Sequence, residues 1–143
     1  MKILLGVGNE LRGDDGIGPH VAQSFSADGW KSIDCSTVPE NYTGVVKREG
    51  PGSIVIIDSA DMGLEPGEVR VIPKEKIGGL AISTHSMPLS LLIDHLEESC
   101  KDITLIGVQP KQVGDFLELS DEAKKAAQEI IQALKTGTTL SSL

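Results

Sequence analysis

A glycine-rich stretch near the start of the chain constrains the fold more than any other sequence feature. Residues 6–18 contain five glycines and follow residues 3–5, an apolar run short enough for a buried strand. Glycine permits positive φ angles and close approach of backbones. We therefore expect a sharp turn that presents two adjacent acids, Asp14 and Asp15, beside the start of a helix, where negative charge is favoured.

The same glycines also suggest nucleotide-binding alternatives. Gly6 and Gly8 follow a strand as in the dinucleotide fingerprint, but that fingerprint has a third glycine where this chain has Leu11. The chain contains no Gly-Lys-Ser/Thr sequence of the kind that a Walker phosphate loop requires. A simpler interpretation is that one of the two acids caps the following helix, which leaves the other acid for chemistry.

Composition limits the possible classes of protein. The chain has 143 residues, which we interpret as one domain over residues 1–143. Its net charge of −8 disfavours nucleic-acid and anionic-membrane partners. No signal peptide or membrane-spanning run is recognisable, so a cytoplasmic location is expected. Cys35 and Cys100 form no Cys-x-x-Cys pair, and we assign neither a role.

Strand-like and helix-like segments alternate along the chain. The expected strands are residues 3–5, 30–36, 53–57, 68–72 and 103–108, and the expected helices are residues 16–27, a short one from 40, 87–100 with Ser86 as its N-cap, and a final one opened by Ser120. The connection before residues 68–72 is too short for a helical crossover, so this strand should be antiparallel. The prediction is an α/β fold, a three-layer α/β/α sandwich with a mostly parallel five-stranded sheet containing one antiparallel strand. Residues 137–143 should form a frayed tail.

A second acid, Asp58, lies where the strand at residues 53–57 is expected to end. Ligands of parallel α/β sheets bind at the carboxyl ends of the strands. If this strand is a parallel neighbour of residues 3–5, Asp15 and Asp58 lie on the same edge of the sheet.

The three histidines differ in their surroundings. His20 lies at the margin of an apolar helix stripe and is interpreted as structural, and His95 lies on the solvent flank of its helix. His85 precedes a helix and has hydroxyl residues on both sides, which could hold one ring nitrogen and leave the other to a ligand. The residues alone support a structural role and a ligand role for His85 equally.

Four segments, in this order, resemble the hydrogenase maturation endopeptidases, which trim the C-terminus of the large subunits of nickel-iron hydrogenases. The similarity extends from residue 2 to about residue 135 and is closest to the formate-hydrogenlyase-type and archaeal branch. The segments are Gly6-Val7-Gly8-Asn9-x-Leu11-x-x-Asp14-Asp15-Gly16-x-Gly18, then Asp58-Ser59-Ala60-Asp61-Met62-Gly63-Leu64-x-Pro66-Gly67-Glu68, then Thr84-His85-x-Met87-Pro88-Leu89, and then Gly107-Val108-Gln109-Pro110.

The resemblance implies a monomeric protease whose metal-binding and catalytic residues are Asp15, Asp58 and His85. Some family members have a glutamate at the position of Asp15. Asp14 matches an acid with a structural or supporting role, and Asp61 is a weaker ligand candidate. The implied substrate is the nickel-loaded precursor of a hydrogenase large subunit, with nickel brought by the substrate and with zinc or cadmium able to replace it in vitro.

Several mechanisms and functions remain open from the sequence. Two carboxylates and one imidazole suit nickel or zinc, so a metal-polarised carbonyl or a metal-activated water is the expected chemistry. An aspartic-type mechanism, with Asp14 and Asp15 sharing a proton, is an alternative. A nickel-binding assembly chaperone that does not cut its partner, or a small nucleotide-binding module, would be a non-enzymatic alternative.

Overall fold

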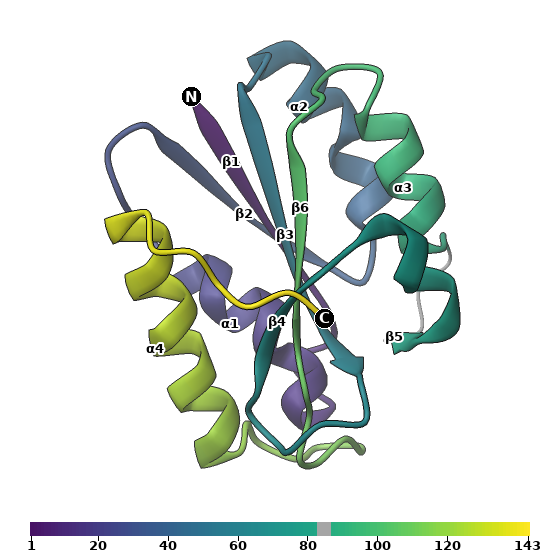
Figure 1. Ribbon diagram of the computed structural model, residues 1–143, viewed down its shortest axis with the longest axis vertical. Helices are drawn as coiled ribbons and strands as arrows, with labels where there is room; N and C mark the ends of the chain where they lie inside the picture. The colour runs from purple at the N-terminus through teal and green to yellow at the C-terminus, as the bar shows by residue number, and fades with distance from the viewer. Residues whose placement is uncertain (83–86) are drawn as a thin grey trace.

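A mixed β-sheet forms the centre of the protein. The structure is a computed structural model that describes residues 1–82 and 87–143 (Figure 1). Its strands are β1 (Lys2–Val7), β2 (Trp30–Ser36), β3 (Ser53–Asp61), β4 (Val69–Ile72), β5 (Ala81–Ile82) and β6 (Ile103–Val108). In the order β2-β1-β3-β6-β4, β4 is antiparallel at one edge and the other neighbours are parallel. The expected five-stranded sheet is confirmed, and the two-residue β5 adds an antiparallel pair at the end of β3.

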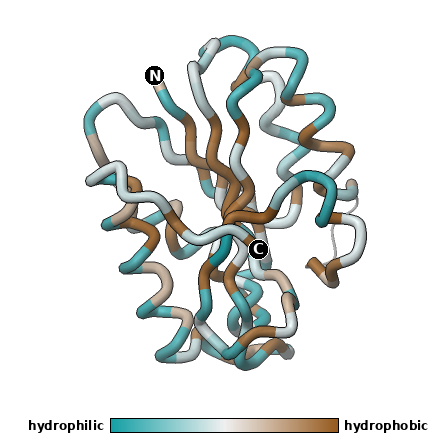
Figure 2. Tube along the Cα trace, in the orientation of Figure 1, coloured by the Kyte–Doolittle hydropathy of each residue, from teal (hydrophilic) through white to brown (hydrophobic). Residues whose placement is uncertain are grey.

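Helices cover both faces of the sheet, and hydropathy follows these layers. The helices are α1 (Ile17–Ser24) and α4 (Asp121–Thr136) on one face, and α2 (Thr43–Glu49) and α3 (Leu89–Leu96) on the other (Figure 1). Short 3-10 turns form η1 (Gly13–Gly16), η2 (Pro39–Tyr42) and η3 (Lys74–Gly79). Apolar residues concentrate in the central strands and polar residues on the outside (Figure 2). The predicted three-layer α/β/α sandwich is confirmed.

Local sequence explains where helices α3 and α4 begin. The residues of α3 that were expected to face inward are all buried: Leu89, Leu92, Ile93 and Leu96. This helix is shorter than expected and follows Pro88 as its N-cap residue, while Ser86, the expected cap, lies outside the described residues. The predicted start of α4 is confirmed, because the Oγ of Ser120 accepts a hydrogen bond from the Ala123 N–H. No helix in the described ranges has the length and hydropathy needed to cross a membrane.

The glycine-rich stretch lets α1 pack directly against the sheet. A Cβ atom on Gly18 would lie 2.3 Å from the carbonyl oxygen of Val7 and 2.4 Å from that of Ile57. Gly8 has a φ of +147° and leaves similarly little room beside the carbonyl oxygen of Asp15. The helix therefore lies close to the end of β1 and to Ile57 of β3, and η1 lies at the carboxyl edge of the sheet.

Strand β3 is longer than the sequence predicts. The expectation that it ends at Asp58 is wrong, because Asp58 and Ser59 still pair with Gly107 and Val108 of β6, and Ala60 and Asp61 pair with β5. Pairing with β1 does stop at Ile57. Asp58 therefore lies inside β3, one residue beyond the last residue of β3 that pairs with β1.

The C-terminal residues are ordered along the edge of the sheet. The Val71 N–H donates to the carbonyl oxygen of Ser141, and the Leu143 N–H donates to that of Val71, each over 2.8 Å. Ser142 forms a bridge with Val71 of β4. The prediction of a frayed tail over residues 137–143 is wrong, because the free edge of β4 provides backbone partners that the tail's own composition does not reveal.

Candidate active site

Asp15 is hydrogen-bonded to Ser59, the residue that follows Asp58. The Ser59 hydroxyl donates a hydrogen bond to Oδ1 of Asp15 over 3.1 Å, and the Ser59 N–H donates to Oδ1 of Asp58 over 2.8 Å. Both acids are buried, with exposed fractions of 7% for Asp15 and 1% for Asp58. The expectation that they share one edge of the sheet is confirmed. Ser59, which the sequence analysis did not single out, links them.

The carboxylate of Asp15 has few compensating contacts for a buried acid. Besides Ser59, it accepts a long hydrogen bond of 3.3 Å from the Asn9 N–H to Oδ2. Within residues 1–82 and 87–143, no lysine or arginine forms an ion pair with it. Burying a charge without a counter-charge is costly. A cation held beside Asp15 would offset this cost, so the site suits a positively charged ligand.

A cavity opens beside Asp15. Its volume is about 300 Å³, which is enough room for part of a peptide or a small ligand. Its polar lining residues come from the ends of η1, β3 and β6, and its apolar lining residues come from β5 and the connection after β6. They are Asp15, Ser59, Asp61 and Gln109, and Ala81, Ile82, Pro110 and Val113.

Gln109 holds the chain that leaves β3. Its side-chain Oε1 accepts hydrogen bonds from the Met62 and Leu64 N–H groups over 2.6 and 3.3 Å, and its Nε2 donates to Oδ1 of Asp61. The hydrogen bond from Gln109, followed by one from the Gly63 N–H, lowers the pKa of Asp61. Asp61 is exposed and already bonded within its own loop, consistent with its ranking below Asp15 and Asp58 as a candidate ligand. The sequence analysis gave Gln109 no role; the signal that could have indicated one is a polar residue directly after the apolar strand at residues 103–108.

Asp14 is turned away from the cavity and into the connection between β6 and α4. Its carboxylate accepts hydrogen bonds from the N–H groups of Lys111, Gln112 and Ser120 and from the Ser120 hydroxyl, at 2.7 to 3.2 Å. Asp14 and Asp15 therefore contact different elements and are not arranged as a pair sharing a proton. The expected supporting role of Asp14 agrees with these contacts.

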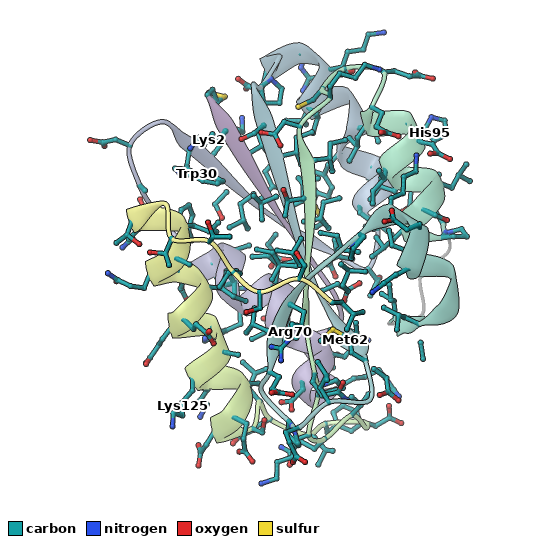
Figure 3. The ribbon with its side chains drawn as sticks, in the orientation of Figure 1. Lys2, Trp30, Met62, Arg70, His95 and Lys125 are labelled. Atoms are coloured by element: carbon teal, nitrogen blue, oxygen red, sulfur yellow. The ribbon has the colours of Figure 1, made fainter. Side chains whose placement is uncertain are left out.

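The structure describes two of the three histidines, and their surroundings differ. His95 is exposed on α3 and points outward, as predicted (Figure 3). His20 is half-buried on α1, and its pKa is lowered by burial and, to a lesser extent, by the nearby Lys124. His85 lies outside the described residues. Among the residues that are described, no group of three side chains could hold a metal ion.

The cysteines do not contribute to this site. Cys35 and Cys100 are both buried as free thiols, and neither lines the cavity. Burial raises the pKa of the Cys35 thiol to about 12, with smaller contributions from Asp34 and Glu40. A thiol in this state is not a nucleophile near neutral pH.

Comparison with known proteins gives one consistent result. The family model described as hydrogenase maturation protease matches residues 18–136. The hydrogenase 3 maturation protease of Escherichia coli strain K12 is 37% identical over 137 residues, covering 93% of this chain and 88% of that protein. The solution structure of an endopeptidase from Escherichia coli is similar with a TM-score of 0.90 and 34% identity, covering 100% of this chain and 96% of that one. A nickel-iron hydrogenase maturation protease from Thermococcus kodakarensis is similar with a TM-score of 0.84 and 30% identity, covering 96% and 91%. This chain belongs to the hydrogenase maturation protease family.

Proposed function

We propose that the protein is an endopeptidase that removes a C-terminal peptide from the nickel-loaded precursor of a nickel-iron hydrogenase large subunit. Its family membership and the names of its relatives support peptidase activity in hydrogenase maturation. The observation that supports a site here is the hydrogen bond between the Ser59 hydroxyl and Asp15, two residues that line one cavity, with Asp58 directly before Ser59 in β3. A precursor segment bound in that cavity would lie against a buried carboxylate.

In this proposal, the two carboxylates and His85 recognise the nickel ion of the precursor. Carboxylate oxygens and imidazole nitrogens are accepted ligands for nickel. Asp15 fits this role because it is buried beside the cavity without an ion pair from the described residues. The part of Ser59 is to orient Asp15 through its hydroxyl and Asp58 through its N–H, so that both acids keep a fixed position before the substrate arrives.

We expect the site to bind metal weakly when the substrate is absent. Permanent zinc sites usually include several histidines or thiolates, whereas this set has two acids and one histidine. The affinity of a weak site for nickel increases most when the incoming nickel already carries ligands from the precursor. Cleavage would then depend on nickel insertion, because the metal positions the bond to be cut.

The reaction itself is a peptide hydrolysis. Water adds to the scissile carbonyl carbon, the C–N bond breaks, and the products are a shortened large subunit with a new carboxylate and a free peptide with a new amino group. The nickel of the substrate would polarise the scissile carbonyl or the attacking water. Asp14 does not act as a proton-sharing partner in this scheme, because its carboxylate oxygens accept hydrogen bonds from the β6–α4 connection.

The test is incubation of the purified protein with nickel-loaded precursor, followed by mass spectrometry of the large subunit. A shorter large subunit supports the protease. Intact precursor held in a stable complex would instead support a nickel-binding chaperone. The same enzyme should leave nickel-free precursor uncut, and cleavage of both forms at equal rates would exclude recognition of nickel.

A chelation experiment tests the source of the metal. Enzyme that has been treated with a chelator, and then freed of it, should process nickel-loaded precursor at the original rate. If activity returns only when zinc is added back to the enzyme, the metal is a resident cofactor and the precursor does not supply it.

A further inference from the structure

Large exposed apolar side chains gather beside the cavity. Leu11 is 63% exposed, and three more side chains from the connection between β6 and α4 complete the group. We call this group the apolar rim: Leu11, Val113 (47% exposed), Phe116 (84%) and Leu117 (42%). Among the described residues, Met1 and Leu91 are the remaining large apolar side chains with comparable exposure. Most of the exposed large apolar side chains therefore lie at one place, at the carboxyl edge of the sheet.

The rim is built from two loops that are joined by their backbones. The Phe116 N–H donates to the carbonyl oxygen of Leu11, and the Gly13 N–H donates to that of Leu117 over 2.9 Å. An ion pair between Arg12 and Asp115 joins the same loops at the surface. Figure 1 shows the β6–α4 connection at the bottom of the view, near the start of α1. Leu11 and Phe116, which are far apart in sequence, thus belong to one surface.

Phe116 is held in an unfavourable backbone conformation. Its φ of 61° is in the left-handed region, which bulky residues rarely adopt. The Asp14 hydrogen bonds to Lys111, Gln112 and Ser120 fix the backbone on both sides of this segment. An exposed phenylalanine buries little apolar surface, and strained backbone positions cluster at active sites and ligand-binding segments.

We propose that the apolar rim binds apolar side chains of the hydrogenase precursor next to the bond that is cut. The inference rests on the proposed function, because the cavity is where that function places the scissile bond. Val113 belongs both to the cavity lining and to the rim, so the two surfaces are continuous. A polypeptide with its scissile bond at Asp15 has to continue out of the cavity, and in this proposal it continues over Val113 toward Phe116. Exposed apolar patches of this kind are typical of protein interaction sites.

The sharpest test is Phe116→Asn. Asparagine tolerates the left-handed conformation better than phenylalanine, so the loop should keep its shape and the melting temperature should stay the same or rise. The aromatic contact with the precursor is lost, so KM for the precursor should rise about tenfold while kcat changes less than about twofold. Stability and substrate affinity are thus expected to respond differently to one substitution, which loss of a merely structural residue would not produce.

A matched control removes an exposed apolar side chain elsewhere. Leu91→Gln, on α3 and outside the rim and the cavity lining, should leave KM and kcat unchanged. The wild-type enzyme is assayed in parallel: if it does not cut the precursor, the proposed function fails. If it cuts and Phe116→Asn has the same KM, the rim proposal fails while the function stands. A wild-type dimer in sedimentation that becomes a monomer in Phe116→Asn would identify the rim as a self-association surface and would also overturn the proposal.

Discussion

Asp14 and Asp15 are adjacent in sequence and both buried, yet they serve different parts of the molecule. Asp14 accepts four hydrogen bonds from the connection between β6 and α4. Asp15 accepts one from Ser59 and a long one from Asn9, and it lines the cavity. One acid joins two distant segments of the chain, and the other is presented to a ligand.

The difference arises from the short 3-10 turn in which both residues lie. Successive side chains of such a turn point in different directions, so neighbouring acids reach different elements. The lesson is that the number of hydrogen bonds a buried carboxylate accepts indicates its task. A fully bonded acid is part of the fold, and a sparsely bonded acid beside a cavity is a candidate for chemistry.

The largest expected effect is on activity in Asp15→Asn. The amide has nearly the same shape and its oxygen can still accept from Ser59, so the free energy of unfolding should change by less than about 1 kcal/mol. Loss of the negative charge should lower kcat/KM for nickel-loaded precursor by about 100-fold or more. The measurement is processing by gel shift with urea unfolding in parallel. Activity within tenfold of wild type would show that Asp15 is not a ligand.

The second effect is on stability in Asp14→Asn. The amide keeps one acceptor, but its NH₂ group faces N–H and O–H donors of the β6–α4 connection, which leaves buried donors without partners. The free energy of unfolding should fall by about 2–4 kcal/mol. Urea denaturation measures this loss, and processing per folded molecule should fall less than in Asp15→Asn. A variant as stable as wild type but inactive would assign Asp14 to the site and remove the contrast.

A smaller effect separates the two serines that serve these acids. Ser59→Ala removes the hydroxyl that orients Asp15, so kcat should fall about tenfold, with about 1 kcal/mol or less of stability lost. Ser120→Ala removes the hydroxyl that serves Asp14 and the N-cap of α4, so stability should fall by about 1–2 kcal/mol with kcat unchanged. Both variants are compared by thermal melts and initial rates. Equal effects of the two substitutions on kcat would contradict the assignment of Ser59 to the active site and of Ser120 to the fold.

The smallest effect concerns His20, the half-buried histidine of α1. Its folded-state pKa lies below the ordinary 6.5, so the unfolded chain binds a proton more readily. Stability should therefore decrease as the pH falls below about 6.5 and should be insensitive to His20 above that value. His20→Gln should flatten the dependence of stability on pH below about 6.5, as measured by urea midpoints. An unchanged slope would show that other groups cause the acid sensitivity.

Much of the fold followed from local patterns. The continuous β-branched run of β3 predicted a buried central strand, and the spacing of Leu89, Leu92, Ile93 and Leu96 predicted the inner face of α3. The short connection before β4 predicted its antiparallel direction. Each of these features depends on residues close together in sequence, and this is why they could be derived from it.

The remaining features depend on contacts between distant segments. The extension of β3 to Asp61 requires β5 and β6, and the ordered C-terminal residues require the edge of β4. The motifs pointed to Asp15 and Asp58 and also contain Ser59, but they gave no role to Ser59, which hydrogen-bonds to both acids. The sequence by itself determined the layers, the strand directions and the candidate acids, because local hydrophobic periodicity and turn residues specify them. Only the tertiary structure decided that Asp14 holds the β6–α4 connection and that Asp15 faces the cavity, because a side chain's partners depend on which loops the folded sheet brings side by side.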